Sequence, residues 1–314
     1  MKSFDVPVFD MHLHLPAPGR RRPWGAWGER LAQERGQEVL DLWVQRARKR
    51  RQRMWKESSF PEPESPRPDP EEGARRYAQE VERYGLEGLC FATGGGNDQL
   101  AQAIAGHPKL HGLAHHNPFA LDAADELERA VGDLGLVGYK VLAPALEGKL
   151  SDPRLAPVWD TCAKLEIPVL IHFGPLGGGG GIVAGPNISP LSLHDVAKGW
   201  PHTPFIVPHF GAGYLRELLH LMWACDNVYV DTSGSNQWRL YMWPQPSLED
   251  LFKLFFDRFG AGRILFGTDS SHFPRGWVVQ YAEGQLAAAR QAGLKDPDLE
   301  QVFRDNAVEL LSIA

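Results

Sequence analysis

Apolar residues gather along the chain in eight short runs, and stretches with a helical spacing of apolar positions separate most of them. Several runs are almost continuously apolar, as in "IPVLIHF", which is typical of strands in a parallel sheet that is covered by helices. The predicted strands cover residues 6–14, 88–93, 111–117, 136–142, 167–173, 204–210, 227–233 and 263–269.

Five amphipathic stretches between these runs predict helices, at residues 70–85, 120–135, 152–166, 212–225 and 247–260. Asp152 and Ser247 stand where helix N-caps are expected, and Gly85 and Gly260 stand where helices end. Strands that alternate with helices favour a (β/α)₈ TIM barrel, a fold of the α/β class, with residues 1–314 as one domain. A doubly wound open sheet is the alternative, but "LHLPAPGRRR" after the first strand lacks the glycine fingerprint of that fold.

Residues 16–69 interrupt the alternation of strands and helices. They separate the first strand from its helix, whereas such connections are usually only a few residues long. The segment begins with a helix-like part and continues into "FPEPESPRPDPEE", where the prolines disfavour regular structure. It leaves from the carboxyl end of the first strand, which is the catalytic face of such a barrel. We therefore expect a helical insertion that acts as a lid or lines the mouth of the site.

The overall composition excludes several classes of protein. The formal net charge of −6 argues against a general nucleic-acid-binding protein, and the chain has no apolar run of the length that a membrane helix needs. The stretch "MKSFDVPVFD" lacks the apolar core of an export signal. Cys90, Cys162 and Cys225 are far apart and odd in number, which favours free thiols in a reducing cytosol. We expect a cytoplasmic protein whose partner is a small molecule.

Polar residues close four of the predicted strands. His12 and His14 end the first strand, His172 the fifth, His209 the sixth and Asp269 the eighth. In a barrel these positions share one face. A hydrogen-bonded core histidine is a sufficient explanation for any one of them, but buried polar groups cost several kcal/mol unless they are paired. A shared metal ion would pair four of the five at once, so the pattern favours a metal site.

With these residues the chain resembles the amidohydrolase superfamily, in the branch that includes aminocarboxymuconate-semialdehyde decarboxylase, the resorcylate decarboxylases and some lactonases. The matching stretches are "FDMHLHL", "IHFG", "PHFGAG", "VYVDTSG", "ILFGTDSSH" and "FRDNAVELL". The resemblance implies one divalent ion, usually zinc, bound by His12, His14, His172 and Asp269. It also implies that His209 and Asp269 act as the catalytic groups, with Asp269 both binding the ion and accepting a proton.

Two further residues on the predicted strands have alternative roles. Asp10 is expected on the same strand face as His12 and His14, where it either orients a ligand imidazole or forms a polar plug in the barrel. Lys140 lies on the predicted fourth strand. In binuclear members of the superfamily a carboxylated lysine on that strand bridges two metals; otherwise Lys140 forms an ion pair within the barrel or faces the substrate.

Substrate contacts are expected from the start of the insertion, because it follows His14 directly and arginine suits carboxylate recognition. The candidate substrate-contact residues are Arg20, Arg21, Arg22, Trp24, Lys140 and His272. At least some of six tryptophans are expected to line an aromatic pocket: Trp24, Trp27, Trp43 and Trp55 in the insertion, and Trp238 and Trp243 in the loop after the seventh strand. The basic run "RARKRRQR" at residues 46–53 is expected on the surface or, in a homodimer, against an acidic surface of a second subunit.

Together these features predict a metal-dependent hydrolase in which a metal-bound water attacks an ester, lactone or amide of a small carboxylated or aromatic compound. A non-oxidative decarboxylase of an aromatic or unsaturated carboxylic acid is the alternative, because it would use the same ligands. A third hypothesis is a non-catalytic binding protein that the metal stabilises.

Overall fold

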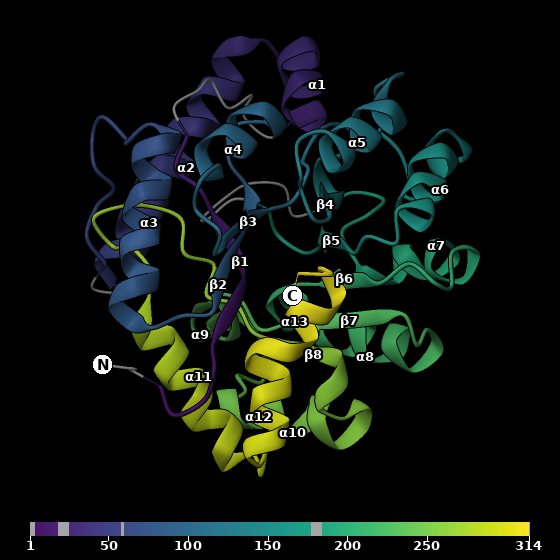
Figure 1. Cartoon of the computed structure of the whole chain (residues 1–314). Helices are drawn as coiled ribbons and strands as arrows, with labels where there is room; N and C mark the ends of the chain where they lie inside the picture. The colour runs from purple at the N-terminus through teal and green to yellow at the C-terminus, as the bar shows by residue number, and fades with distance from the viewer. Residues whose placement is uncertain (1–3, 18–24, 58–59, 177–183, 314) are drawn as a thin grey trace.

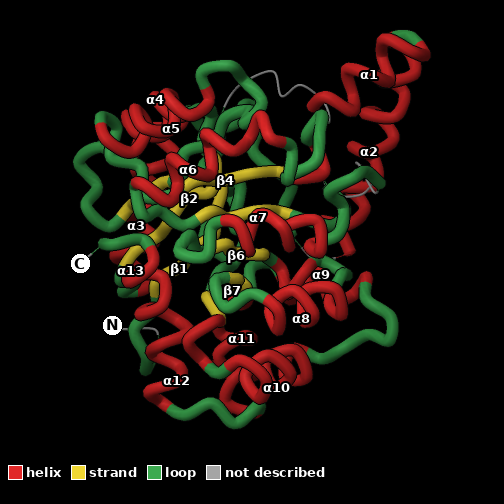
Figure 2. The backbone as a smooth tube through the Cα atoms, turned by 90° about the vertical axis from the view of Figure 1, so that its right-hand side faces the viewer, coloured by secondary structure: helices red, strands yellow, loops and turns green. Residues whose placement is uncertain are grey.

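The computed structural model describes residues 4–17, 25–57, 60–176 and 184–313. Eight short parallel strands form its centre, and helices surround them (Figures 1 and 2). The strands are β1 (Phe9–His14), β2 (Gly88–Thr93), β3 (Leu110–Gly112), β4 (Tyr139–Leu142), β5 (Val169–His172), β6 (Phe205–Val207), β7 (Val228–Asp231) and β8 (Ile264–Leu265).

The strands follow one another around a closed ring. They pair in the orders β1-β2-β3 and β4-β5-β6-β7-β8, and every pair is parallel. Single bridges join the two groups, Ala114 to Tyr139 at one seam and Leu13 to Ser270 at the other. At the second seam the His14 N–H also donates to the Ser270 carbonyl, at 2.8 Å. The predicted α/β architecture with a ring of eight strands is therefore present.

Thirteen α-helices are present in the described residues. They are α1 (Gly25–Arg35), α2 (Gln37–Glu57), α3 (Pro70–Tyr84), α4 (Asn97–Ile104), α5 (Ala123–Gly132), α6 (Ala156–Lys164), α7 (His194–Gly199), α8 (Leu215–Ala224), α9 (Ser235–Trp238), α10 (Leu248–Phe259), α11 (Val279–Gln291), α12 (Asp296–Glu300) and α13 (Asn306–Leu310). None of the described helices combines the length and the apolar character that a membrane-spanning segment requires.

In several strands, alternate residues belong to two different apolar clusters, which shows which side chains point into the ring. In β5, for example, Val169 and Ile171 pack in the large cluster beneath the helices, whereas Leu170 packs in a small inner cluster. The buried residues of the inner cluster come from β1, β2, β5, β6 and β8, together with Leu113 after β3 and with Ala307 and Leu311 of the carboxyl-terminal segment. Apolar side chains thus fill much of the interior of the ring. A polar site has room at the carboxyl ends of the strands.

The insertion after β1 consists of the two helices α1 and α2, which pack on each other and project from the body of the protein (Figure 2). Most of their described side chains are exposed. The return segment, residues 61–68, has no helix or strand, as its prolines predicted. It is held to the barrel, because the Glu64 N–H donates to the Phe273 carbonyl at 2.8 Å and Glu64 accepts from Arg76.

Helix α10 begins with a complete capping box, as the position of Ser247 predicted. The Ser247 hydroxyl accepts from the Asp250 N–H at 2.9 Å, and the Asp250 carboxylate accepts from the Ser247 N–H at 2.8 Å. This reciprocal pair satisfies two backbone donors that a helix otherwise leaves without partners.

We predict that Ser247→Ala lowers the free energy of unfolding by about 1 kcal/mol, because the N-cap acceptor is lost. Urea denaturation followed by circular dichroism measures this. Ser151→Ala, at an exposed serine outside any helix cap, is the matched control. Equal unfolding midpoints for wild type and Ser247→Ala would show that the capping box contributes nothing.

Candidate metal centre

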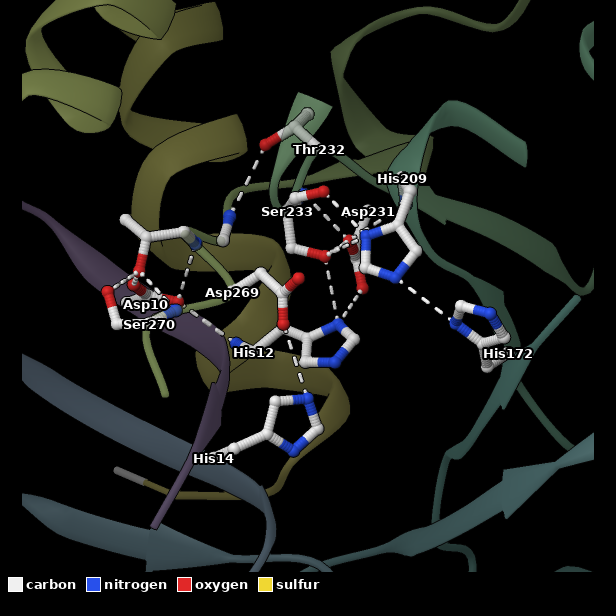
Figure 3. A network of polar contacts seen from close by, with 12 residues as sticks. Asp10, His12, His14, His172, His209, Asp231, Thr232, Ser233, Asp269 and Ser270 are labelled. Carbon is white, nitrogen blue, oxygen red and sulfur yellow. Dashed lines mark hydrogen bonds and ion pairs between the residues drawn. The ribbon is translucent and has the colours of Figure 1, made fainter. Parts of the chain in front are cut away.

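The carboxyl ends of the strands bring together five of the residues that the sequence singled out (Figure 3). His12 and His14 lie on β1 and His172 is the last residue of β5. His209 follows β6 and Asp269 follows β8. His12, His172 and His209 are all less than a tenth exposed, so their ring nitrogens need partners inside the protein.

His12, His14 and Asp269 form the group best placed to hold a metal ion. One ligand atom from each lies within 4.8 Å of the other two, and His14 Nε2 is 3.2 Å from an Asp269 carboxylate oxygen. His12 Nε2 is buried and has no hydrogen-bond partner in the described chain. A buried nitrogen without a partner is costly, and two imidazoles with a carboxylate suit a divalent first-row ion. His12, His14 and Asp269 therefore fit the divalent metal ion that the sequence predicted.

Asp231, the last residue of β7, fixes the orientation of the His12 ring. Its Oδ2 atom is 2.8 Å from His12 Nδ1. Because an ionised carboxylate only accepts hydrogen bonds, Nδ1 carries the proton and Nε2 keeps the lone pair that a metal needs. Burial alone would raise the pKa of Asp231, but the neighbouring His12 and His209 hold it below its usual range. Sequence analysis did not single out Asp231, although it also closes an apolar strand.

A hydroxyl orients the second ligand. His14 Nδ1 lies 2.7 Å from Thr93 Oγ1 at the end of β2, which directs Nε2 towards Asp269. Burial opposes ionisation of Asp269, but the hydrogen bond from His14 and the nearby His209 lower its pKa. The backbone of Asp269 is in the left-handed region, with φ +59°, a conformation that costs a non-glycine residue about 1 kcal/mol or more. Its N–H donates to the His12 carbonyl at 2.9 Å, which helps to hold it there.

His209 lies beside the three candidate ligands and packs against the ring of Trp238. Its Nδ1 donates to the Ser233 carbonyl at 2.6 Å, so Nε2 is the acceptor and points to His172 Nδ1 at 3.2 Å. Trp238 stacks on its ring, with centroids 5.3 Å apart. Burial lowers the pKa of His209 to about 4, which makes the imidazole neutral at pH 7. Its φ of +62° is again left-handed.

His172 is close to the group but is not turned towards it. Its Nδ1 faces His209, and its Nε2 is 3.2 Å from the Pro175 carbonyl. Burial lowers the pKa of His172 well below its usual value, so the ring carries one proton for these two acceptors. Ligation by His172 requires the ring to leave one of them, and its role as the fourth ligand stays a prediction.

Asp10 does not orient an imidazole, and its predicted place on the face of His12 and His14 is wrong. The pairing of β1 with β2 shifts register between Asp10 and Leu13, and such a shift breaks the alternation of side chains. Asp10 accepts instead from the backbone N–H of His12 at 3.0 Å, from the Thr268 hydroxyl and from the Trp277 indole. Figure 3 shows Asp10 and Ser270 apart from the imidazole rings.

The candidate substrate residues fall into two groups. Lys140 and His272 are buried, at 1% and 6% exposure. Arg20, Arg21, Arg22 and Trp24 lie outside the described residues. Of the two tryptophans after β7, Trp238 contacts His209, whereas Trp243 is 95% exposed. Trp238 therefore lies at the site, and an aromatic-lined pocket stays a prediction.

Comparison with known proteins agrees with this geometry. A family model described as amidohydrolase matches residues 9–313 of the chain. A curated relative, 2-amino-3-carboxymuconate-6-semialdehyde decarboxylase of Dictyostelium discoideum, is 33% identical over 78 residues. That match covers 24% of this chain and 22% of the relative, so it compares about a quarter of the two proteins.

Solved structures share the fold at low sequence identity. A probable 2-pyrone-4,6-dicarboxylic acid hydrolase of Acinetobacter baumannii, solved with citric acid, has a TM-score of 0.64 and 14% identity, over 98% of this chain and 100% of that one. The 5-carboxyvanillate decarboxylase of Novosphingobium aromaticivorans, solved with manganese and 4-hydroxy-3-methoxy-5-nitrobenzoic acid, has a TM-score of 0.61 and 14% identity, over 98% of this chain and 97% of that one.

We predict that the purified protein binds about one divalent ion per chain, since three ligands converge on one point. His14→Ala should lose the ion because a ligand is removed, whereas His202→Ala, at an exposed histidine, should keep it. Elemental analysis after gel filtration measures both. Two ions per chain would instead favour a binuclear centre that includes Lys140 and His209.

We further predict that Asp231→Asn weakens metal binding about 10- to 100-fold while the fold is kept, the usual effect of losing a carboxylate behind a ligand histidine. The amide no longer fixes the proton on His12 Nδ1. Competition with a chelator measures the affinity. Asp226→Asn is the control, since Asp226 precedes the same strand and is fully exposed. Unchanged affinity in Asp231→Asn would mean that His12 is not a ligand.

Proposed function

Because the chain belongs to the amidohydrolase family, we propose that it is a metal-dependent enzyme that removes the carboxyl group from a small aromatic or unsaturated carboxylic acid without an oxidant. One observation carries this proposal: a buried, neutral His209 lies between the candidate metal ligands and the Trp238 ring. Decarboxylation needs a group that can deliver a proton to the carbon, and a neutral imidazole beside the candidate ligands can take up a proton and return it.

The candidate ligands are His12, His14 and Asp269, with His172 as a fourth that must turn. A divalent ion held there would supply positive charge to neutralise a carboxylate and an adjacent oxygen of the substrate. Two imidazoles and a carboxylate suit zinc and manganese alike. Zinc as the resident ion, the homodimer and the cytoplasmic location stay predictions.

The proton transfers follow from the protonation state of His209. Its Nε2 lone pair takes the proton of a substrate hydroxyl group. The bond between the ring carbon and the carboxylate then breaks, carbon dioxide leaves, and the bonding electrons remain on the carbon. His209 returns its proton to that carbon, so that the imidazole ends neutral as it began. Trp238 packs on the face of the His209 ring.

Hydrolysis of a lactone is the second candidate, and the similarity to the hydrolase structure favours it. In that reaction His209 would take its proton from water rather than from the substrate. The relative named as a decarboxylase and the solved decarboxylase with a bound benzoic acid support the first candidate. The two reactions use the same residues, so their products must separate them.

We expect carbon dioxide release when the metal-loaded protein is given a panel of hydroxybenzoic and unsaturated carboxylic acids. Dissolved carbon dioxide is measured directly, and the chelated protein is the control. A parallel panel of lactones is followed by acid release at constant pH. Acid release without carbon dioxide release would establish the hydrolase and remove the decarboxylase proposal.

We expect His209→Asn to lower kcat by on the order of 10²–10⁴-fold, because asparagine can form hydrogen bonds but cannot exchange a proton. The bound metal and the unfolding midpoint should stay at wild-type values. His220→Asn, at an exposed histidine on α8, is the matched control. Loss of metal in His209→Asn would make His209 a ligand, and an unchanged kcat would leave Asp269 as the only acid–base group.

A further inference from the structure

Lys140 lies on the inner face of the barrel, directly beneath the candidate metal centre. Its neighbours Tyr139 and Val141 pack in the outer cluster under the helices, so Lys140 must point into the ring. It pairs in register with Leu170 of the inner cluster, and two residues later Leu142 pairs with His172. Lys140 is 1% exposed, so its ammonium group is enclosed by the barrel.

The ammonium group of Lys140 has no hydrogen bond or ion pair with any described residue. The two nearby carboxylates are already engaged, Asp231 by His12 and Asp269 by His14. Lys140 is nevertheless close to these side chains: burial first, and then its charge, lower the pKa of His12, and Asp231 and Asp269 act on the pKa of Lys140 itself. Burial lowers the pKa of Lys140 to about 8, and Asp231 and Asp269 oppose that effect, so the group is mostly protonated at pH 7.

Burying a cation costs several kcal/mol unless a close counter-ion compensates it, and the two carboxylates near Lys140 are already engaged by His12 and His14. In the enzyme proposed above, the counter-ion arrives with the substrate. We propose that Lys140 is the subsite for a carboxylate oxygen of the substrate, so that it selects acids over neutral compounds of the same shape. This inference rests on the proposed function only in assuming that the substrate is a carboxylic acid. A lactone that carries a carboxylate would be bound at Lys140 in the same way.

The first test compares an acid with its decarboxylated counterpart, using 2,6-dihydroxybenzoate and resorcinol as probes. Titration calorimetry is carried out on the metal-loaded wild type and on Lys140→Met, which keeps the length of the side chain. We expect the affinity for the acid to fall about 10- to 100-fold, as for the loss of a charge-assisted hydrogen bond. The affinity for resorcinol should change by less than about threefold.

Lys164→Met is the matched control, because Lys164 is 66% exposed and pairs with Glu128 on the surface. It removes the same charge from the whole protein without touching the barrel, and it should bind both probes as the wild type does. Equal losses in the two variants would overturn the proposal in favour of long-range attraction. So would an unchanged affinity for the acid in Lys140→Met, or the absence of saturable binding of the acid to the wild type.

The second test is the stability of the unliganded protein. Because Lys140 is a buried charge that forms no hydrogen bond or ion pair with a described residue, Lys140→Met should raise the urea midpoint. A lowered midpoint would mean that Lys140 has a structural partner and would overturn the proposal. A carbamate signal in the carbon-13 spectrum of wild-type protein kept in labelled bicarbonate, absent in Lys140→Met, would also overturn it, because a carboxylated lysine cannot bind a carboxylate as a cation.

Failure of this inference is distinguishable from failure of the proposed function. If carbon dioxide is released and Lys140→Met binds acids as the wild type does, the decarboxylase stands and the subsite is wrong. If no carbon dioxide is released but Lys140→Met binds the acid more weakly and resorcinol with unchanged affinity, Lys140 is the carboxylate subsite of an enzyme that catalyses another reaction. In an active enzyme, the variant should raise KM more than it lowers kcat, as expected for the loss of substrate binding.

Discussion

The Asp231 carboxylate is the contact on which the site depends, because it joins the ends of three strands. One oxygen holds His12 on β1, and the other accepts from the backbone N–H of His209, after β6, at 3.3 Å and from that of Ser233 at 2.8 Å. The buried Asp231 carboxylate thus determines which ring nitrogen of His12 carries the proton. It also positions the backbone of His209, the candidate acid–base group. It also explains how His209 is kept in a left-handed conformation that its side chain disfavours.

Strand order and the location of the site could be predicted from the sequence, because both follow from where apolar runs end. β2 begins and ends at the predicted residues, and His12, His14 and His172 lie at the carboxyl ends of strands. His209 lies two residues beyond β6 and Asp269 four residues beyond β8, on the same side of the barrel. The resemblance to amidohydrolases is confirmed by the family match over residues 9–313. The insertion was expected to be helical, and α1 and α2 occupy it.

Features that depend on contacts between distant segments could not be predicted in the same way. β8 is shorter than its apolar run because the Phe266 N–H donates to the Val302 carbonyl in the carboxyl-terminal helices. A register shift, which no pattern of residue types reveals, moved Asp10 away from the imidazoles. Asp231 could have been found, since it closes "NVYVD" as His172 closes "IPVLIH", but pattern alone does not show that it faces His12.

The seam between β1 and β8 has a consequence for the order of events in the cell. Two of the three converging ligands belong to the first strand, and the third lies more than two hundred residues later, at Asp269. During synthesis the amino-terminal strand leaves the ribosome long before its last partner exists. The complete set of ligands therefore forms only after most of the chain has been made. An ion that needs all three is bound only after Asp269 has been made, and the supply of ions at that moment helps to decide which one is kept.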